Sequence, residues 1–195
     1  MSGTHTDARI SRQVRRLETL LEERGIVVGA VLDEMLDAFL SGATPLNGAR
    51  VVARAWTDPA YRERLLADGT AAVTELGLSA GGVQPQRLRV VENTEDTHNV
   101  VVCTLCSCYP VRLLGPSPSW YKSEAYRSRV VREPRAVLAE FGLRLPSTTR
   151  ITVWDSSAET RYLVLPRRPS STASLTEEEL AARVTRNALI GTAAL

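Results

Sequence analysis

The three cysteines of this chain, Cys103, Cys106 and Cys108, lie in one six-residue segment. Thiolates are soft, anionic ligands, and three of them in a short loop gather a transition metal more readily than they form a stable disulfide. The peptide units at Ser107 and Cys108 lie beside the sulfurs, so their deprotonated amide nitrogens could complete an equatorial plane. Three thiolates and two amide anions suit a small trivalent ion, with the sixth position open to substrate or water. The spacing therefore predicts a metal site, and we name residues 103–108 the metal claw.

Other kinds of cysteine site fit the chain less well. A structural zinc site needs four ligands, but the chain adds only His5 and His98 to the three cysteines. His5 lies in a polar stretch, and the short connection from His98 to Cys103 would strain a site of three cysteines and one histidine. An iron–sulfur cluster generally needs a fourth cysteine as well. A solitary histidine without a carboxylate partner is usually structural, and we expect that role for His98 rather than catalysis.

The segment from Cys103 to Cys108 resembles the metal-binding motif of the nitrile hydratase alpha subunit. The similarity is specific and covers nearly the full length, from about residue 10 onward. The segments that carry it outside the claw are residues 47–56, 91–94, 98–102, 120–122, 127–135 and 153–157. The resemblance implies an enzyme subunit that hydrates a nitrile to the corresponding amide.

The resemblance also implies the nature of the metal centre. A non-corrin cobalt(III) or non-haem iron(III) ion would be held by the sulfurs of Cys103, Cys106 and Cys108 and by the backbone amides of Ser107 and Cys108. In this family the last two cysteines are oxidised. Cys106 would therefore be a sulfinate and Cys108 a sulfenate, while Cys103 would remain an axial thiolate.

Residues beside the cysteines favour cobalt over iron. Thr104 and Tyr109 resemble the cobalt subgroup, whereas the iron enzymes tend to have serine and threonine at these positions. We expect an activator or metallochaperone protein to load the cobalt, and a beta-type subunit to supply arginines that hydrogen-bond the oxidised sulfurs. In this chain Arg112, Arg127 and Arg129 could offset the negative charge of the claw, but we expect them to be surface arginines.

The mechanism that the resemblance implies is centred on Cys108. A nitrile polarised by the metal would be attacked at carbon by the sulfenate oxygen of Cys108, or that oxygen would activate a water molecule.

Gln84 stands 19 residues before Cys103, where the family places a glutamine near the metal pocket, although Pro85 replaces the usual glycine. A lone loop glutamine is also commonly a solvated hydrogen-bonding residue. The hydroxyl of Ser107 can bond a sulfur oxygen or simply favour the tight turn.

The chain departs from its relatives just after the claw. The family commonly places a tryptophan three residues after the last cysteine, but here Val111 and Arg112 follow Tyr109 and Pro110. If residue 111 lines the pocket, the small side chain opens space beside the metal, and Arg112 adds donors for a polar substrate. This predicts a bulky heteroaromatic nitrile as the substrate; alternatively, Val111 repacks against a bulkier partner residue.

Two other functions are left open. They are thiocyanate hydrolysis, as by the thiocyanate hydrolase gamma subunit, and a non-enzymatic metal-binding role.

The composition excludes some classes of protein. The chain has 195 residues with 24 lysines and arginines against 22 aspartates and glutamates, a balance that does not suggest a nucleic-acid partner. No apolar run approaches the roughly 20 residues of a membrane-spanning helix, and no signal peptide is visible. We expect a cytoplasmic protein, in a compartment that keeps thiols reduced.

We expect an α+β fold, with a helical N-terminal arm followed by an α/β layered domain that carries the claw at a strand end. The expected divisions are a flexible tail (residues 1–9), a helical segment (10–77) and a metal-binding catalytic domain (78–195). Apolar residues at helical spacing predict that the N-terminal helices form either a small bundle or an arm laid on a partner, and the resemblance favours an arm over the beta subunit.

Particular elements follow from local patterns. Gly25 should end the first helix, and Asp58 with Pro59 should begin another that continues to Gly77. Thr176 and Glu179 form a capping-box pattern that opens a last helix through Ala188, ended by Gly191. The other expected elements are strands over 88–92 and 99–102, a hairpin of 151–154 with 161–165, and helices over 31–39, 47–56 and 134–141.

Overall fold

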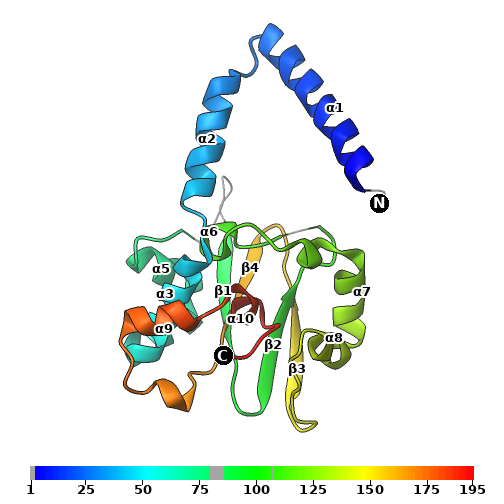
Figure 1. Cartoon of the computed structure of the whole chain (residues 1–195). Coiled ribbons are helices and arrows are strands. Elements are labelled where there is room, and N and C mark those ends of the chain that lie inside the picture. Colours follow the sequence, from blue (N-terminus) through cyan, green and yellow to red (C-terminus); the bar gives the residue numbers. More distant parts are fainter. Residues whose placement is uncertain (1–2, 80–85, 107) are drawn as a thin grey trace. The chain divides into compact units, whose positions relative to one another are not determined.

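The computed structural model of the chain describes residues 3–79, 86–106 and 108–195 (Figure 1). The chain divides into two compact units, Met1–Gly42 and Ala43–Leu195. Within the described ranges all strands belong to the second unit. No helix in these ranges is both long and apolar enough to cross a membrane.

The first unit consists of helices α1 (Gly3–Glu23) and α2 (Gly29–Ser41). Gly25, with a φ of 65°, follows the end of α1 as predicted, and the carboxylate of Glu22 accepts a hydrogen bond from the N–H of Gly29 at 2.9 Å. Because α1 begins at Gly3, it includes most of the stretch that we expected to be a flexible tail. No proline interrupts this stretch, so the helix extends beyond the first residue of its apolar stripe.

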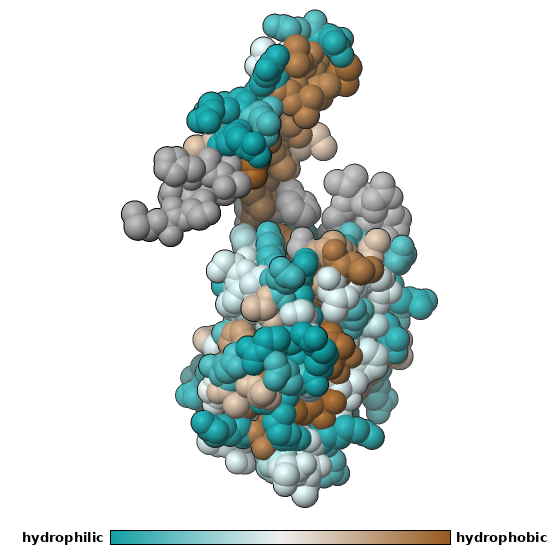
Figure 2. Space-filling view, turned by 90° about the vertical axis from the view of Figure 1, so that its right-hand side faces the viewer, coloured by the Kyte–Doolittle hydropathy of each residue, from teal (hydrophilic) through white to brown (hydrophobic). Residues whose placement is uncertain are grey.

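Both helices of the first unit leave apolar side chains exposed. Val14 and Leu17 on α1 are each 57% exposed, and Met35 on α2 is 61% exposed. Apolar side chains gather along one side of these helices in Figure 2. An uncovered apolar stripe of this kind is typical of a surface that packs on a partner.

The second unit contains strands β1 (Arg87–Glu92), β2 (Thr97–Val102), β3 (Arg150–Asp155) and β4 (Thr160–Leu165). β1 pairs with β4 and β2 pairs with β3, both in parallel, and β2 also contacts β4 (Figure 1). β2 is buried from its second residue to its end, as predicted for a strand covered on both faces. Its pairing with β3 sets Val102 opposite Asp155, so the two strands end at the same edge.

The predicted hairpin of residues 151–154 with 161–165 was wrong. Both strands exist, but β3 and β4 pair with β2 and β1 and not with each other. Strand patterns in a sequence do not say which strands pair. Pairing with β1 and contact with β2 bury Leu163, Val164 and Leu165 completely, whereas an isolated two-stranded hairpin would leave them partly in water.

Three helices lie on the side of β1 in Figure 1: α3 (Pro45–Thr57), α4 (Pro59–Ala67) and α5 (Gly69–Glu75). α4 and α5 contact β1. These three helices therefore belong to the second unit, and the compact units divide after Gly42 rather than at residue 77.

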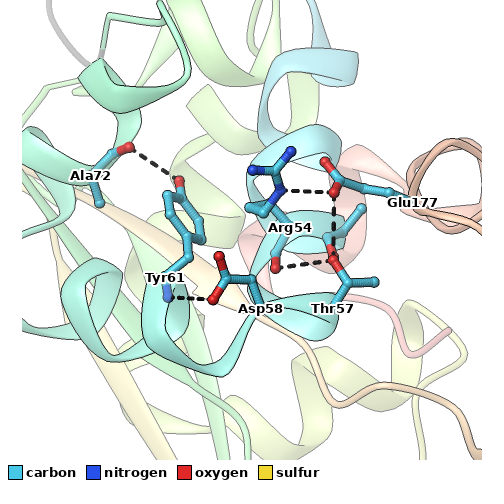
Figure 3. A network of polar contacts seen from close by, with 7 residues as sticks. Arg54, Thr57, Asp58, Tyr61, Ala72 and Glu177 are labelled. Carbon is cyan, nitrogen blue, oxygen red and sulfur yellow. Dashed lines mark hydrogen bonds and ion pairs between the residues drawn. The ribbon is translucent and has the colours of Figure 1, made fainter.

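Hydrogen bonds fix these helices to one another (Figure 3). Asp58 accepts a hydrogen bond from the N–H of Tyr61 at 2.9 Å, which confirms the predicted N-cap of α4. The hydroxyl of Tyr61 donates to the carbonyl of Ala72 at 3.2 Å and ties α4 to α5. Arg54 donates to Glu177 at 2.7 Å and links α3 to the C-terminal helices.

Two helices that we expected to be continuous are interrupted. The helix that begins after Asp58 stops at Asp68, whose carboxylate caps α5 by accepting a hydrogen bond from Ala71 at 3.1 Å. The last helix is divided into α9 (Glu177–Arg183) and α10 (Arg186–Ile190), because Val184 is extended. In both cases the apolar spacing continues across the break, and a polar residue that caps the next helix marks it. The capping box of Thr176 with Glu179 and the end at Gly191 are as predicted.

The remaining helices complete the second unit. Helix α8 (Pro134–Glu140) has the predicted position, whereas α7 (Glu124–Arg132) was not predicted, since it buries only Tyr126 and Val130. The shorter elements are α6 (Val111–Leu114), η1 (Ser119–Lys122) and η2 (Ser170–Thr172). The mixed α+β class expected from the sequence is confirmed.

Candidate metal centre

The metal claw begins where β2 ends. Cys103 follows Val102 directly and is buried, Cys108 is half-buried, and Cys106 is exposed. The N–H of Ser156, just after β3, donates to the carbonyl of Val102 at 2.7 Å and continues the strand pairing up to the claw. A rigid sheet thus holds one end of the loop, while Cys106 remains open to solvent.

The three cysteine sulfurs converge on one point. Cys103 Sγ lies 3.2 Å from Cys106 Sγ, Cys106 Sγ lies 3.0 Å from Cys108 Sγ, and all three lie within 4.8 Å of one another. Two sulfurs bound to one ion at about 2.3 Å would lie about 3.3 Å apart at a right angle and about 3.8 Å apart at a tetrahedral angle. The two spacings of Cys106 Sγ, 3.2 Å to Cys103 Sγ and 3.0 Å to Cys108 Sγ, are nearer the right-angle value. The donor set therefore fits an octahedral ion better than a tetrahedral zinc ion.

Asp155, the last residue of β3, holds the second residue of the claw. Its Oδ1 accepts a hydrogen bond from the N–H of Thr104 at 2.9 Å, and its Oδ2 accepts one from the hydroxyl of Thr104 at 2.5 Å. The two residues are 51 positions apart in the sequence. Because β2 and β3 are parallel, their ends meet at one edge and bring these residues together. This contact was not predicted, since its signal in the sequence was one polar residue at the end of a largely apolar strand.

Side chains from η1 and α7 reach the other end of the claw. The hydroxyl of Tyr121 donates to the carbonyl of Cys108 at 3.0 Å, and Nη1 of Arg127 donates to the carbonyl of Cys106 at 2.8 Å. We expected Arg127 to be a surface arginine, which was wrong. Its backbone position on α7 is close enough to the claw for the side chain to lie half-buried against it.

The thiol of Cys108 lies in an environment that disfavours its charged form. Burial raises the pKa of Cys108 to about 12, the hydrogen bond with Cys106 adds to the rise, and the positive charge of Arg161 opposes it. A thiol in this setting stays protonated unless a further positive charge stabilises the thiolate, as a bound metal ion does. Arg161 is itself buried in β4. It was not predicted to lie near the claw.

Two charged nitrogens beside the claw are buried without a hydrogen-bond partner among the described residues. They are Nε of Arg127 and Nε of Arg161. Buried donors nearly always have an acceptor. Oxygen atoms on oxidised cysteine sulfurs would be acceptors of the right charge, so these two donors fit the oxidised claw that the resemblance implies.

Two of the predicted site residues, Gln84 and Ser107, lie outside the described residues. Val111 begins α6, three positions after Cys108, and is half-buried. Arg129 is engaged in ion pairs with Glu133 and Glu140, each at 2.6 Å, as expected for a surface arginine.

His98 lies at the far end of β2 from the claw and supports the fold. Its Nε2 lies 2.7 Å from the carbonyl of Gly191, and its Nδ1 lies 3.2 Å from Nδ2 of Asn93. A strand rises about 3.3 Å per residue, which places His98 roughly 16 Å from Cys103. The alternative of a zinc site with three cysteines and His98 is therefore excluded.

We expect His98 to make the protein less stable in mild acid. Burial lowers the pKa of His98 below its usual range, so below about pH 6.5 the unfolded chain binds the proton more readily than the folded chain does. The free energy of unfolding should fall as the pH falls from about 6.5 through the folded pKa. His98→Gln keeps a donor toward Gly191 but cannot be protonated.

Thermal unfolding at about pH 7.5 and about pH 5.5 tests this expectation. The loss of stability between the two should be smaller in His98→Gln than in the parent protein. An equal loss in both would assign the acid sensitivity to groups other than His98.

Comparison with known proteins identifies the family. Residues 8–193 match the family model described as "Nitrile hydratase, alpha chain". The chain is 51% identical over 183 residues to the cobalt-containing nitrile hydratase subunit alpha of Pseudonocardia thermophila, covering 93% of this chain and 89% of that protein. It is 49% identical over 158 residues to the thiocyanate hydrolase subunit gamma of Thiobacillus thioparus, covering 76% of this chain and 65% of that protein.

A solved structure with the same fold is a double mutant of the Fe-type nitrile hydratase from Comamonas testosteroni Ni1. It has a TM-score of 0.89 and 42% sequence identity, over 96% of this chain and 91% of that chain. The family match spans the claw, the strands that end at it and the helices around it. This chain therefore belongs to the nitrile hydratase alpha chain family.

Proposed function

We propose that this chain is the metal-binding alpha subunit of a cobalt nitrile hydratase, which adds water to a nitrile and forms the amide. The observation that carries the proposal is the convergence of three cysteine sulfurs within 4.8 Å of one another in a loop held by a sheet. Cobalt is favoured over iron by Thr104 and Tyr109. It is also favoured by two cobalt-containing relatives, at 51% and 50% identity, each covered over 93% of this chain.

The ligands would be the sulfurs of Cys103, Cys106 and Cys108 and the backbone nitrogens of Ser107 and Cys108. When bound, the cobalt(III) ion would supply Lewis-acid polarisation of the nitrile. Cys106 as a sulfinate and Cys108 as a sulfenate would keep the negative charge that the buried donors of Arg127 and Arg161 can bond.

Cys108 would carry the chemistry. Its sulfenate oxygen either attacks the nitrile carbon, to be released by water, or removes a proton from a water molecule that attacks instead. By either route one water molecule is consumed and its two protons end on the former nitrile nitrogen. The amide oxygen comes from that water or, where water attacks the sulfur and replaces the sulfenate oxygen, from the sulfenate. Gln84, which the family places near the pocket, would orient the substrate or the water by hydrogen bonding.

A beta-type subunit would complete the site, and an activator protein would load the cobalt. Support comes from the first unit, whose α1 and α2 expose apolar stripes that this unit does not cover. Further support comes from Cys106 and Leu105 in the claw, which face solvent where a partner subunit would close the site. The cytoplasm, which keeps cysteines reduced until loading, is the compartment that we expect.

The substrate that we favour is a bulky heteroaromatic nitrile. Val111 stands half-buried three residues after Cys108, at a position where the resemblance implies a tryptophan. If residue 111 borders the substrate, replacing an indole by an isopropyl group leaves room for a larger nitrile.

We expect Val111→Trp to lower kcat/KM for a heteroaromatic nitrile by at least about 10-fold while sparing a nitrile of acrylonitrile size. Steady-state kinetics on both substrates test this. Val131→Trp, at a half-exposed position on α7, is the matched control and should leave the ratio unchanged. An equal effect of Val111→Trp on both substrates, or a preference of the parent enzyme for small nitriles, would contradict the assignment.

The experiment that tests the function is co-expression with a beta-type subunit, an activator and cobalt, followed by measurement of amide formation. Thiocyanate is assayed in parallel, since the gamma subunit of thiocyanate hydrolase is also a relative. Turnover of thiocyanate but not of nitriles would favour that alternative. Zinc bound to three unmodified cysteines, without turnover, would support a non-enzymatic metal-binding protein.

A further inference from the structure

Three side chains of one segment donate hydrogen bonds to the backbone around the claw. Tyr126 donates to the carbonyl of Val101 at 2.7 Å, Arg127 to that of Cys106 at 2.8 Å, and Tyr121 to that of Cys108 at 3.0 Å. The donors all come from η1 and α7, whereas the acceptors run from the end of β2 through the claw. This segment therefore brackets the claw, with contacts from the end of β2 to Cys108.

Arg127 differs from the two tyrosines because it carries a charge. No carboxylate of the described residues pairs with it, whereas Arg129, two positions later, pairs with Glu133 and Glu140. The Nε of Arg127 is buried and also lacks a partner among the residues described. The positive charge of Arg127 is therefore not neutralised by an acidic side chain, and one of its donors contacts the claw.

We infer that Arg127 is a positioning residue of the metal centre, which holds the Cys106 carbonyl and offsets the negative charge of the claw. The inference rests on the proposed function. Three thiolates and two amide anions carry more negative charge than a trivalent ion neutralises, so a half-buried cation beside them stabilises the loaded state.

If Arg127 acts in cobalt loading, its replacement should have effects that would be absent if Arg127 only attached α7 to the claw. Removing partners that orient metal ligands typically lowers metal affinity or activity about 10-fold to 100-fold. We expect Arg127→Gln, which keeps a donor but loses the charge, to contain about 10-fold less cobalt per chain after expression at limiting cobalt. The absorption band of sulfur-to-cobalt charge transfer should also shift in the fraction that does load, because the field at the sulfurs changes.

The control variant is Arg132→Gln. Arg132 also lies on α7, but the one partner of its side chain among the described residues is the carbonyl of Ser128 in its own helix. It should load cobalt and absorb like the parent protein. Tyr126→Phe removes an uncharged donor of the bracket, and should therefore reduce loading without shifting the band.

The measurements are elemental analysis, the absorption spectrum and thermal unfolding of the metal-free complexes. A parent complex that loads cobalt, together with Arg127→Gln of equal cobalt content and an unshifted band, would overturn the inference about Arg127 alone. A parent complex that binds no cobalt would overturn the proposed function instead. If Arg127→Gln does not fold, Arg127→Lys decides: it keeps the charge with poorer geometry and should load less cobalt than the parent, whereas equal loading would overturn the inference.

Discussion

Replacement of Cys103, Cys106 or Cys108 by serine should abolish cobalt loading and nitrile hydration. A hydroxyl group is a far poorer soft ligand than a thiolate, and each substitution removes one of three sulfurs that lie within 4.8 Å of one another. Loss of an outer partner of a metal ligand already costs about 10-fold to 100-fold, so loss of a ligand should lower activity by more than about 100-fold. Elemental analysis and amide formation by the co-expressed complex measure the two effects.

The same preparations test the oxidation states. In the active parent enzyme, peptide mass spectrometry should find two added oxygens on Cys106 and one on Cys108, each of about 16 Da, and none on Cys103. Thermal unfolding of each serine variant serves as the control, since a folded chain without cobalt separates lost ligation from lost structure. Full activity in any serine variant would contradict the claw assignment. An active enzyme with three unmodified cysteines would contradict the predicted oxidation of Cys106 and Cys108.

The second large effect that we expect concerns the partner subunit. The chain expressed alone should load little cobalt and hydrate nitriles poorly. Without a beta-type subunit, the claw and the apolar stripes of the first unit remain exposed to solvent. Leu17→Glu places a charge in the exposed stripe of α1 and should weaken association by at least about 30-fold, the effect of losing one interface hot spot.

Thr19→Glu is the matched control for that substitution. Thr19 is exposed on α1, two positions from Leu17 and hence on a different face of the helix. Its hydroxyl donates to the carbonyl of Arg15 in the same helix. Titration of the beta-type subunit by light scattering or ultracentrifugation compares the variants. Equal binding of Leu17→Glu and the parent would show that this stripe is not the interface, and undiminished turnover of the chain alone would show that the site needs no partner.

The sequence alone determined the features that depend on neighbouring residues. Three cysteines in six positions must come close together whatever the rest of the chain does, so the metal claw could be recognised without a fold. The caps at Asp58 and Thr176 and the helix ends at Gly25 and Gly191 were equally local, since each depends on a side chain or a φ angle within one turn.

Only the tertiary structure decided which distant residues support the claw. Asp155 reaches Thr104 because β2 and β3 pair in parallel, and the sequence pattern had instead suggested that β3 pairs with β4. Apolar spacing tells which face of a strand is buried but not which strand lies next to it. Likewise Arg127 and Arg161 read as ordinary cations in the sequence, because an arginine becomes a partner of the metal site only when folding sets it beside the cysteines.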